Sequence, residues 1–197
     1  MSCCLGSRTL GKRARTAAEI SAQLLKLPAA ADVDTAAEEA QVSDARAAYD
    51  KLTDAQKTWV SSAALQHLTA VESDIRTNLT SAEAFADAVA ALPGNDQLSK
   101  TAAKQVEMVD AAYKKMSSAQ KNRVSAAALD VLANKQAAVA ANEKAAADLQ
   151  KSVAALPKGA DIDTDAEVQA LNAAMNAYNG MNDAQKSWVD AATVANL

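Results

Sequence analysis

Apolar side chains recur from residue 53 to residue 92 at steps of three or four, the spacing that keeps one face of a helix apolar. The positions of this stripe are Val60, Ala64, Leu68, Val71, Ile75, Leu79, Ala82, Phe85, Val89 and Leu92. Thr53 and Gln56 have the spacing of a capping box, and Pro93 with Gly94 ends the pattern. The pattern predicts one continuous amphipathic helix from Thr53 to Leu92.

Three sequence anchors recur at intervals of 64 or 65 residues, which is typical of tandem structural units. They are a proline after leucine (Pro28, Pro93, Pro157), a tyrosine (Tyr49, Tyr113, Tyr178) and an Ala-Gln-Lys run that contains Gln56, Gln120 or Gln185. The prolines share one slot, as expected of residues that end a helix. We expect a disordered basic leader over 1–15 and helical repeats over 16–76, 77–140 and 141–197, the last shortened at its C-terminal end.

Each repeat divides into three helical segments, the first of which runs into the Leu-Pro anchor. One apolar residue lies five positions after each proline, and we interpret it as a plug under the end of the bundle. The plug residues are Val33, Leu98 and Ile162. A capping box, Thr35 with Glu38 or Thr164 with Glu167, predicts the start of the second helix. This helix carries a narrow apolar seam: Val42, Ala45, Tyr49, Leu52; Val106, Val109, Tyr113, Met116; and Leu171, Ala174, Tyr178, Met181.

The third segment opens at Thr53, Ser117 or Asn182 and turns Val60, Val124 or Val189 inward. Val60 to Leu92 and Val124 to Leu156 have the same length and contain neither proline nor glycine. A loop would usually drift in length, so the third helix of one repeat is expected to continue as the first helix of the next. Thr80 with Glu83 has capping-box spacing, which leaves a break open at the first of these junctions.

The predicted fold is therefore all-α, with three tandem short three-helix-bundle repeats joined end to end by shared long helices. This is a spectrin-like connectivity. The expected shape is an elongated rod, on the order of 80 to 100 Å long at 1.5 Å of rise per residue.

Composition agrees with a helical protein and excludes some functions. Aromatic residues make up 3% of the chain, which argues against β architecture. The net charge is −4, and Arg8, Lys12, Arg13 and Arg15 lie in the leader, so the repeats are the more acidic part. Such a surface repels nucleic acid and anionic membranes.

No segment is long and apolar enough to span a membrane or to serve as a secretory signal. The chain is therefore expected either to stay inside the cell or to be part of a longer secreted protein. Cys3 and Cys4 are adjacent and cannot cross-link the fold. We interpret them as part of the leader, with lipidation as the alternative.

The run from Ala45 to Val60, ARAAYDKLTDAQKTWV, carries the most specific pattern in the chain. It resembles the Ala-rich tandem helical repeats, of YDxLTxxQKxxV type, in large surface proteins of Gram-positive bacteria. The second and third repeats depart from it at 114–118 and 179–180 but keep the tyrosine, the cap and the valine. The resemblance implies an extracellular, non-catalytic role as a spacer between other domains.

Two candidate chemical sites are weak. Asp161, Asp163 and Asp165 resemble the opening of a calcium loop, but Ala166 and Asn172 stand where glycine and glutamate are required. Helix capping explains these acids better. The single histidine, His67, has no partners for a metal cluster or a nucleophilic dyad, and we expect it on a half-exposed flank. We predict no enzyme activity and no cofactor.

Trp59, Arg123 and Trp188 share one register position, one residue before the inward valine. Tryptophans at repeat spacing could bind a glycan or a partner helix. Alternatively, these side chains cover the seam beside the tyrosine.

The leading hypothesis is a structural spacer or stalk in a bacterial cell-surface protein, whose partners are the flanking domains of a longer chain. The alternatives are a binding module for a host protein or glycan and an intracellular or phage scaffold. Exposure of Trp59 and Trp188 distinguishes the binding module.

Overall fold

The computed structural model describes residues 4–29, 32–157 and 159–197, and within these ranges the fold is all-α. Helix accounts for 78% of the structure, and the described ranges contain no strand. The α-helices are α1 (Cys4–Leu24), α2 (Ala36–Asp50), α3 (Asp54–Lys57), α4 (Ser62–Ala90), α5 (Lys100–Lys115), α6 (Ser118–Lys121), α7 (Ala126–Ala154), α8 (Asp165–Gly180), α9 (Asp183–Lys186) and α10 (Ala191–Ala195). Two 3₁₀ turns, η2 (Asn95–Gln97) and η3 (Gly159–Asp161), precede α5 and α8.

The second helix of each repeat lies where the sequence predicts it. Thr35 caps α2 and Thr164 caps α8, each in a complete capping box with the glutamate three residues on. Ser99 has the same role for α5, since its Oγ accepts a hydrogen bond from the Ala102 amide at 3.2 Å. The three helices end one or two residues after Tyr49, Tyr113 and Tyr178.

The predicted single helix from Thr53 to Leu92 is wrong at its start. Thr53 does form a capping box with Gln56, but the helix that it caps, α3, has 4 residues. The chain then turns through Thr58–Ser61 and begins α4 at Ser62. The Ser61 hydroxyl accepts from the Ala64 amide at 3.1 Å, so a second cap follows the first.

The other two repeats also contain two capped helix starts in succession. Ser117 with Gln120 and Asn182 with Gln185 form complete capping boxes on α6 and α9, each of 4 residues. Ser125 and Asp190 then cap α7 and α10. In each repeat a short helix and a turn therefore separate the second helix from the next one.

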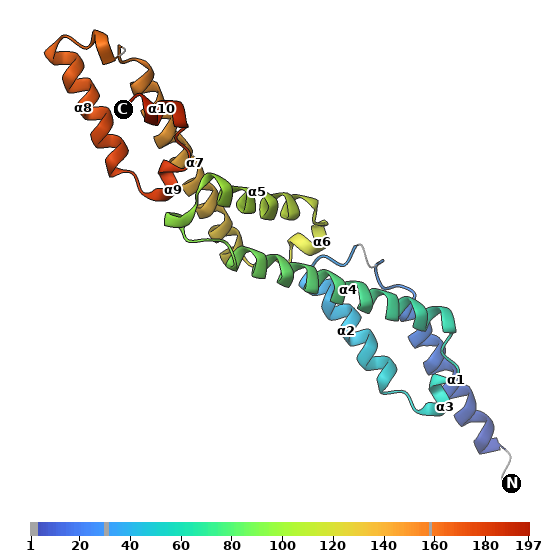
Figure 1. Cartoon of the computed structure of the whole chain (residues 1–197). Coiled ribbons are helices and arrows are strands. Elements are labelled where there is room, and N and C mark those ends of the chain that lie inside the picture. The colour runs from blue at the N-terminus through green and yellow to red at the C-terminus, as the bar shows by residue number, and fades with distance from the viewer. Residues whose placement is uncertain (1–3, 30–31, 158) are drawn as a thin grey trace. The chain divides into compact units, whose positions relative to one another are not determined.

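Beyond this turn the two long helices are continuous. α4 and α7 each run for 29 residues, and Figure 1 shows α4 as one unbroken coil. The break considered at Thr80 and Glu83 does not occur, because both residues lie inside α4.

The leader is helical rather than disordered from Cys4 onward. α1 begins there and runs without interruption to Leu24, so the expected start near Thr16 is wrong. Residues 1–3, with Cys3, lie outside the described residues.

The structure groups into two compact units, Met1–Ala84 with Met116–Val124 and Phe85–Lys115 with Ser125–Leu197. The core of the first unit joins α1, α2 and α4. Its buried residues are Leu24, Val33, Val42, Ala45, Ala64, Leu68 and Val71. Tyr49 and Val60 pack against this cluster, as the sequence predicts.

The predicted stripe of α4 fails at one position. Leu79 is 47% exposed, although it continues the apolar spacing. The core cluster of the first unit extends along α4 to Ile75, and the next buried position is Ala82. Leu79 falls between these two buried stretches.

The core of the second unit contains α7 as its common element. α7 packs against α5 and also against α8. Its C-terminal part contributes Leu149 and Val153 to a cluster with Ala174 of α8, against which Tyr178 and Val189 pack. On the α5 side, the rings of Phe85 and Tyr113 lie 5.3 Å apart between centroids, a favourable aromatic contact.

The predicted plug residues are buried in the first two repeats. Val33 and Leu98 are 0% exposed. Ile162 is only partly buried.

Candidate functional site

Arg123, one of the predicted binding residues, packs within the first unit. It follows α6, and its side chain is only 9% exposed. One guanidinium nitrogen donates to the Ala119 carbonyl at 2.5 Å. The other donates to the carbonyl of the plug residue Val33 at 3.3 Å and forms an ion pair with Glu39. Beside it, the Asn122 amide donates to the Asp34 carbonyl at 3.2 Å.

Trp188 makes the corresponding contact in the second unit. Its indole Nε1 donates to the carbonyl of the plug residue Leu98 at 3.4 Å. The preceding residue, Ser187, accepts from the Lys100 amide at 2.8 Å. Trp188 is partly buried, and its indole nitrogen, like the guanidinium of Arg123, forms a hydrogen bond within the chain.

We call residues 59, 123 and 188 the junction positions, and the contact of such a residue with a plug residue a junction. In both observed junctions the plug residue lies 90 positions earlier in the sequence. Arg123 and Trp188 thus link one repeat to the loop of the repeat before it.

Trp59 differs from the other two junction residues because it is 57% exposed. The Lys57 ammonium lies over the Tyr49 ring, 5.4 Å from its centroid, and Lys186 lies 5.2 Å from the Tyr178 ring. These cation–π contacts explain why lysine ends the Ala-Gln-Lys anchor.

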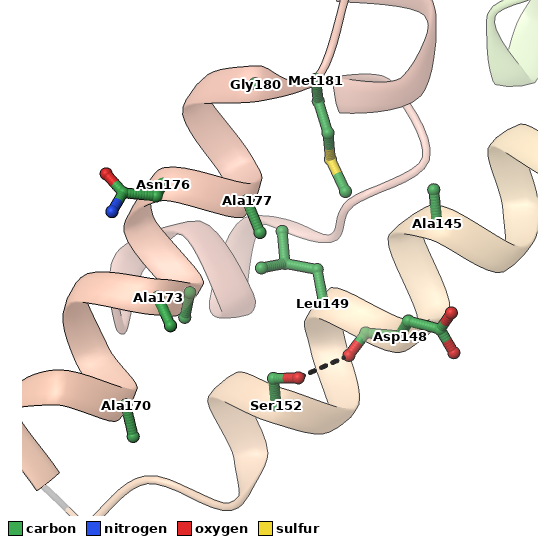
Figure 2. A pocket seen from close by; sticks show the side chains of 11 residues that line it. Ala145, Asp148, Leu149, Ser152, Ala170, Ala173, Asn176, Ala177, Gly180 and Met181 are labelled. Carbon is green, nitrogen blue, oxygen red and sulfur yellow. Dashed lines mark hydrogen bonds between the residues drawn. The ribbon is translucent and has the colours of Figure 1, made fainter. Parts of the chain in front are cut away.

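A groove of about 630 Å³ runs between α7 and α8 in the second unit. Figure 2 shows methyl groups from Ala170, Ala173 and Ala177 on the α8 side. On the α7 side Leu149 points into it, and the Ser152 hydroxyl is bonded to the Asp148 carbonyl at 2.9 Å. Small side chains therefore create the space, and its lining suits apolar contact rather than acid–base chemistry.

The acids of the weak calcium motif lie at and just before the start of α8. Asp161 ends η3, Asp165 begins α8, and the Asp163 amide donates to the Glu167 carboxylate at 3.2 Å. Among the described residues no group of three or more metal-ligating side chains is arranged to hold an ion. His67 is partly buried, with Nε2 3.0 Å from the Leu27 carbonyl oxygen.

Titratable groups are perturbed at helix caps and at one ion pair. The Thr35 hydroxyl lowers the pKa of Glu38, and the Thr164 hydroxyl lowers that of Glu167. The Thr193 amide lowers the pKa of Asp190. Hydrogen bonds from Arg46 to Glu72, at 2.6 and 2.5 Å, raise the pKa of Arg46. These four shifts accompany structural contacts.

Asn142 is a structural residue that sequence reasoning missed. It is 6% exposed on α7, and its Nδ2 donates to the Leu98 carbonyl at 3.1 Å. The signal was present, since Asn142 occupies an apolar-stripe position between Val139 and Ala146. A buried amide at such a position requires a partner.

Comparisons with protein families, with curated proteins and with solved structures find no match to this chain. No helix among the described residues is long and apolar enough to cross a membrane.

Proposed function

We propose that the chain is a non-catalytic spacer, built from three tandem three-helix repeats that share their long helices in a spectrin-like manner. A spacer requires fixed length and stiffness rather than a pocket. The repeat boundaries at 16–76, 77–140 and 141–197 belong to this proposal.

The observation that carries the proposal is the packing of α7. This single helix of 29 residues contacts α5, which belongs to the second repeat, and α8, which belongs to the third. A helix whose packing passes from one repeat to the next supports sharing, because no flexible linker separates the repeats along α7.

The repeated local chemistry supports the same function. Each repeat carries a capping box on its short helix and a second cap four residues after the end of that helix. The junctions then link loops to residues 90 positions away. These caps and junctions fix the direction of the chain at each turn, and a spacer of defined length requires this.

The proposed location is the outer surface of a bacterial cell, within a longer protein whose flanking domains are the immediate partners. This part rests on the resemblance of residues 45–60 to surface-protein repeats. Antibodies against the repeats are expected to label intact cells of the source organism. Labelling only after lysis would instead support the intracellular scaffold.

Small-angle scattering tests the spacer directly. Extrapolated to infinite dilution, it is expected to show an elongated monomer on the order of 80 to 100 Å long, with the cross-section of a three-helix bundle. A compact particle would contradict the proposal.

The exposure of Trp59 favours one second candidate, a binding module for a host protein or glycan. An exposed indole offers a large rigid contact area at low entropic cost. Micromolar binding to such a ligand, abolished by Trp59→Ala without loss of helicity, would support this function. Retention of that binding by Trp59→Ala would exclude Trp59 as its site.

A further inference from the structure

The second helix of a repeat and the long helix that follows it form a groove in both the first and the second repeat. One groove lies between α2 and α4, and the other lies between α5 and α7. An interval of 64 residues relates them, so that Val106 corresponds to Val42. Val139 corresponds to Ile75 in the same way, and all four side chains line the grooves. The α2–α4 groove and the α5–α7 groove are therefore the same structural site with different side chains.

A guanidinium connects the two walls of the α2–α4 groove. Arg46 on α2 donates two hydrogen bonds to the Glu72 carboxylate on α4, from Nε at 2.6 Å and from Nη2 at 2.5 Å. Both residues line the groove, and their side chains are 30% and 27% exposed. Two parallel bonds of this kind are the strongest contact that arginine forms with a carboxylate. The first repeat thus shows which group this site can hold.

The α5–α7 groove lacks this bridge and is rich in carboxylates. Asp110 stands at the position of the bridging arginine, and Gln136 stands at the position of its carboxylate partner. Glu107 on α5 and Glu143 on α7 also line the groove. Their counterparts in the first repeat are uncharged, namely Ser43 and Leu79. Three carboxylates therefore face a site that holds an arginine in the preceding repeat.

The chain neutralises these carboxylates only in part. Asp110 forms an ion pair with Lys114 on the same helix at 2.6 Å. Within the described ranges, Glu107 and Glu143 form no ion pair, and both are exposed. The groove therefore has negative charge to offer a cation from outside the chain.

The α5–α7 groove is enclosed by interior parts of two packed helices. Its residues lie at 103–110 in the 16-residue α5 and at 136–143 in the 29-residue α7. Its volume is about 170 Å³, below the roughly 300 to 1,000 Å³ of sites for small molecules. The groove is therefore suited to a single inserted side chain.

We propose that the α5–α7 groove binds an arginine side chain carried by a basic segment of another protein. The guanidinium lies among Glu107, Asp110 and Glu143 and spans the groove, as the arginine of the first repeat does. Its methylene groups pack on Val106 and Val139. This inference does not rest on the spacer proposal.

The chemistry of the groove selects this partner. Arginine suits it better than lysine, because a planar guanidinium binds two carboxylates at once and is less strongly hydrated than an ammonium. One side chain in an open groove gains little free energy, so the arginine must belong to a polypeptide that adds further contacts. The net charge of −4 favours a basic partner over a second copy of this chain.

Nuclear magnetic resonance of the isotope-labelled full-length chain tests the inference. The probe is the peptide acetyl-Ala-Arg-Ala-Ala-Arg-Ala-amide at low ionic strength, where contacts between charges are strongest. Its titration should produce saturable amide shifts confined to 103–110 and 136–143, and the peptide with lysine for arginine should bind several-fold more weakly. Absence of these shifts, or equal binding of the lysine peptide, would overturn the proposal. Shifts there on concentrating the chain without peptide would identify a second copy as the occupant and overturn the proposed partner.

Transplanting the bridge of the first repeat provides the decisive variant. Asp110→Arg with Lys114→Asp and Gln136→Glu recreates the arrangement of Arg46, Asp50 and Glu72 across α5 and α7. The groove then contains its own guanidinium, so peptide affinity should fall by about tenfold or more, although the chain becomes more acidic. A variant that is folded by circular dichroism and still binds like the wild type would overturn the assigned site.

A matched pair of charge-removing variants separates the groove from general attraction of the basic peptide to an acidic chain. Glu107→Gln with Glu143→Gln should weaken binding by about tenfold. Glu83→Gln with Asp87→Asn removes the same charge from exposed positions on α4 and should bind like the wild type. Equal loss in the two double variants would show attraction without a site and would overturn the proposal.

Discussion

The junctions at Arg123 and Trp188 make the same kind of contact with side chains of different chemistry. Each supplies a hydrogen-bond donor to the carbonyl of a buried plug residue, Val33 in the first unit and Leu98 in the second. The guanidinium also needs Glu39, whereas the indole has no charge to neutralise.

This difference indicates that the junction position requires a hydrogen-bond donor rather than a particular residue type. Leu98 receives two donors, Nδ2 of Asn142 at 3.1 Å and Nε1 of Trp188 at 3.4 Å. In the first junction Arg123 combines the bond to Val33 with an ion pair. The first junction therefore depends more heavily on a single side chain than the second does.

The largest effect is expected from Asn142→Pro, which breaks α7 between its α5 and α8 contacts. The lost backbone hydrogen bond and the ring clash should cost about 3 kcal/mol or more of unfolding free energy. Chemical denaturation followed by Trp188 fluorescence in a Trp59→Phe background measures this cost.

Asn142→Ala is the control that removes the amide but keeps the helix, and it should cost about 1 to 2 kcal/mol. If the proline variant cost no more than this control, continuity of α7 would not matter to stability.

Arg123→Ala should produce the second largest effect, about 2 kcal/mol, because it leaves Glu39 and the Val33 carbonyl without their donor. Urea unfolding followed by circular dichroism measures it. Trp188→Phe removes only the indole donor, while Asn142 still bonds Leu98, so it should cost less than about 1 kcal/mol. Equal costs for the two variants would contradict the asymmetry of the junctions.

The caps provide a smaller and more uniform effect. Thr53→Ala should cost about 1 kcal/mol, because the Thr53 hydroxyl no longer bonds the amide and the side chain of Gln56, and Ser125→Ala should cost a similar amount at the start of α7. Thermal or urea unfolding of each variant tests this. A change below a few tenths of a kcal/mol for Thr53→Ala would show that this hydroxyl does not contribute as a cap.

The smallest effect concerns pH and separates two kinds of capping box. Glu38 and Glu167 have folded pKa values below their ordinary value of 4.5, so their stabilisation is complete above about that pH. It is lost as the pH falls through the lower folded values. The boxes of α3, α6 and α9 use glutamine and do not titrate.

Glu38→Gln with Glu167→Gln should therefore flatten the pH dependence of the urea midpoint below a pH of about 4.5. Gln56→Ala, which removes a neutral cap partner, should shift the midpoint without changing that slope. An unchanged slope in the double variant would show that these two carboxylates do not control acid sensitivity.

Much of the local structure could be predicted from the sequence, because it depends on short-range signals. The capping boxes at Thr35, Thr53 and Thr164 were predicted from spacings of three residues, and all three form. The plug residues Val33 and Leu98 are buried as predicted. The all-α class followed from the apolar periodicity.

The sequence-based predictions are wrong or incomplete where the structure depends on contacts between distant residues or on two competing helix starts. The turn at Thr58–Ser61 interrupts a stripe that is apolar enough for a longer helix, and the second cap residue after each valine was the overlooked signal. Arg123 was a candidate for binding a partner, but its side chain contacts Val33 and Glu39, which lie 90 and 84 residues earlier in the sequence. Periodicity within one helix cannot show which loop covers a side chain.

The two residues of a junction lie 90 positions apart in the sequence, so the junction can form only late during synthesis of the chain. The Val33 carbonyl emerges from the ribosome 90 residues before its donor Arg123. At roughly 5 to 20 residues per second, the first loop waits about 5 to 18 seconds for that donor. During this interval α1, α2 and the start of α4 can already pack together, so each newly made repeat locks the loop of the one before it.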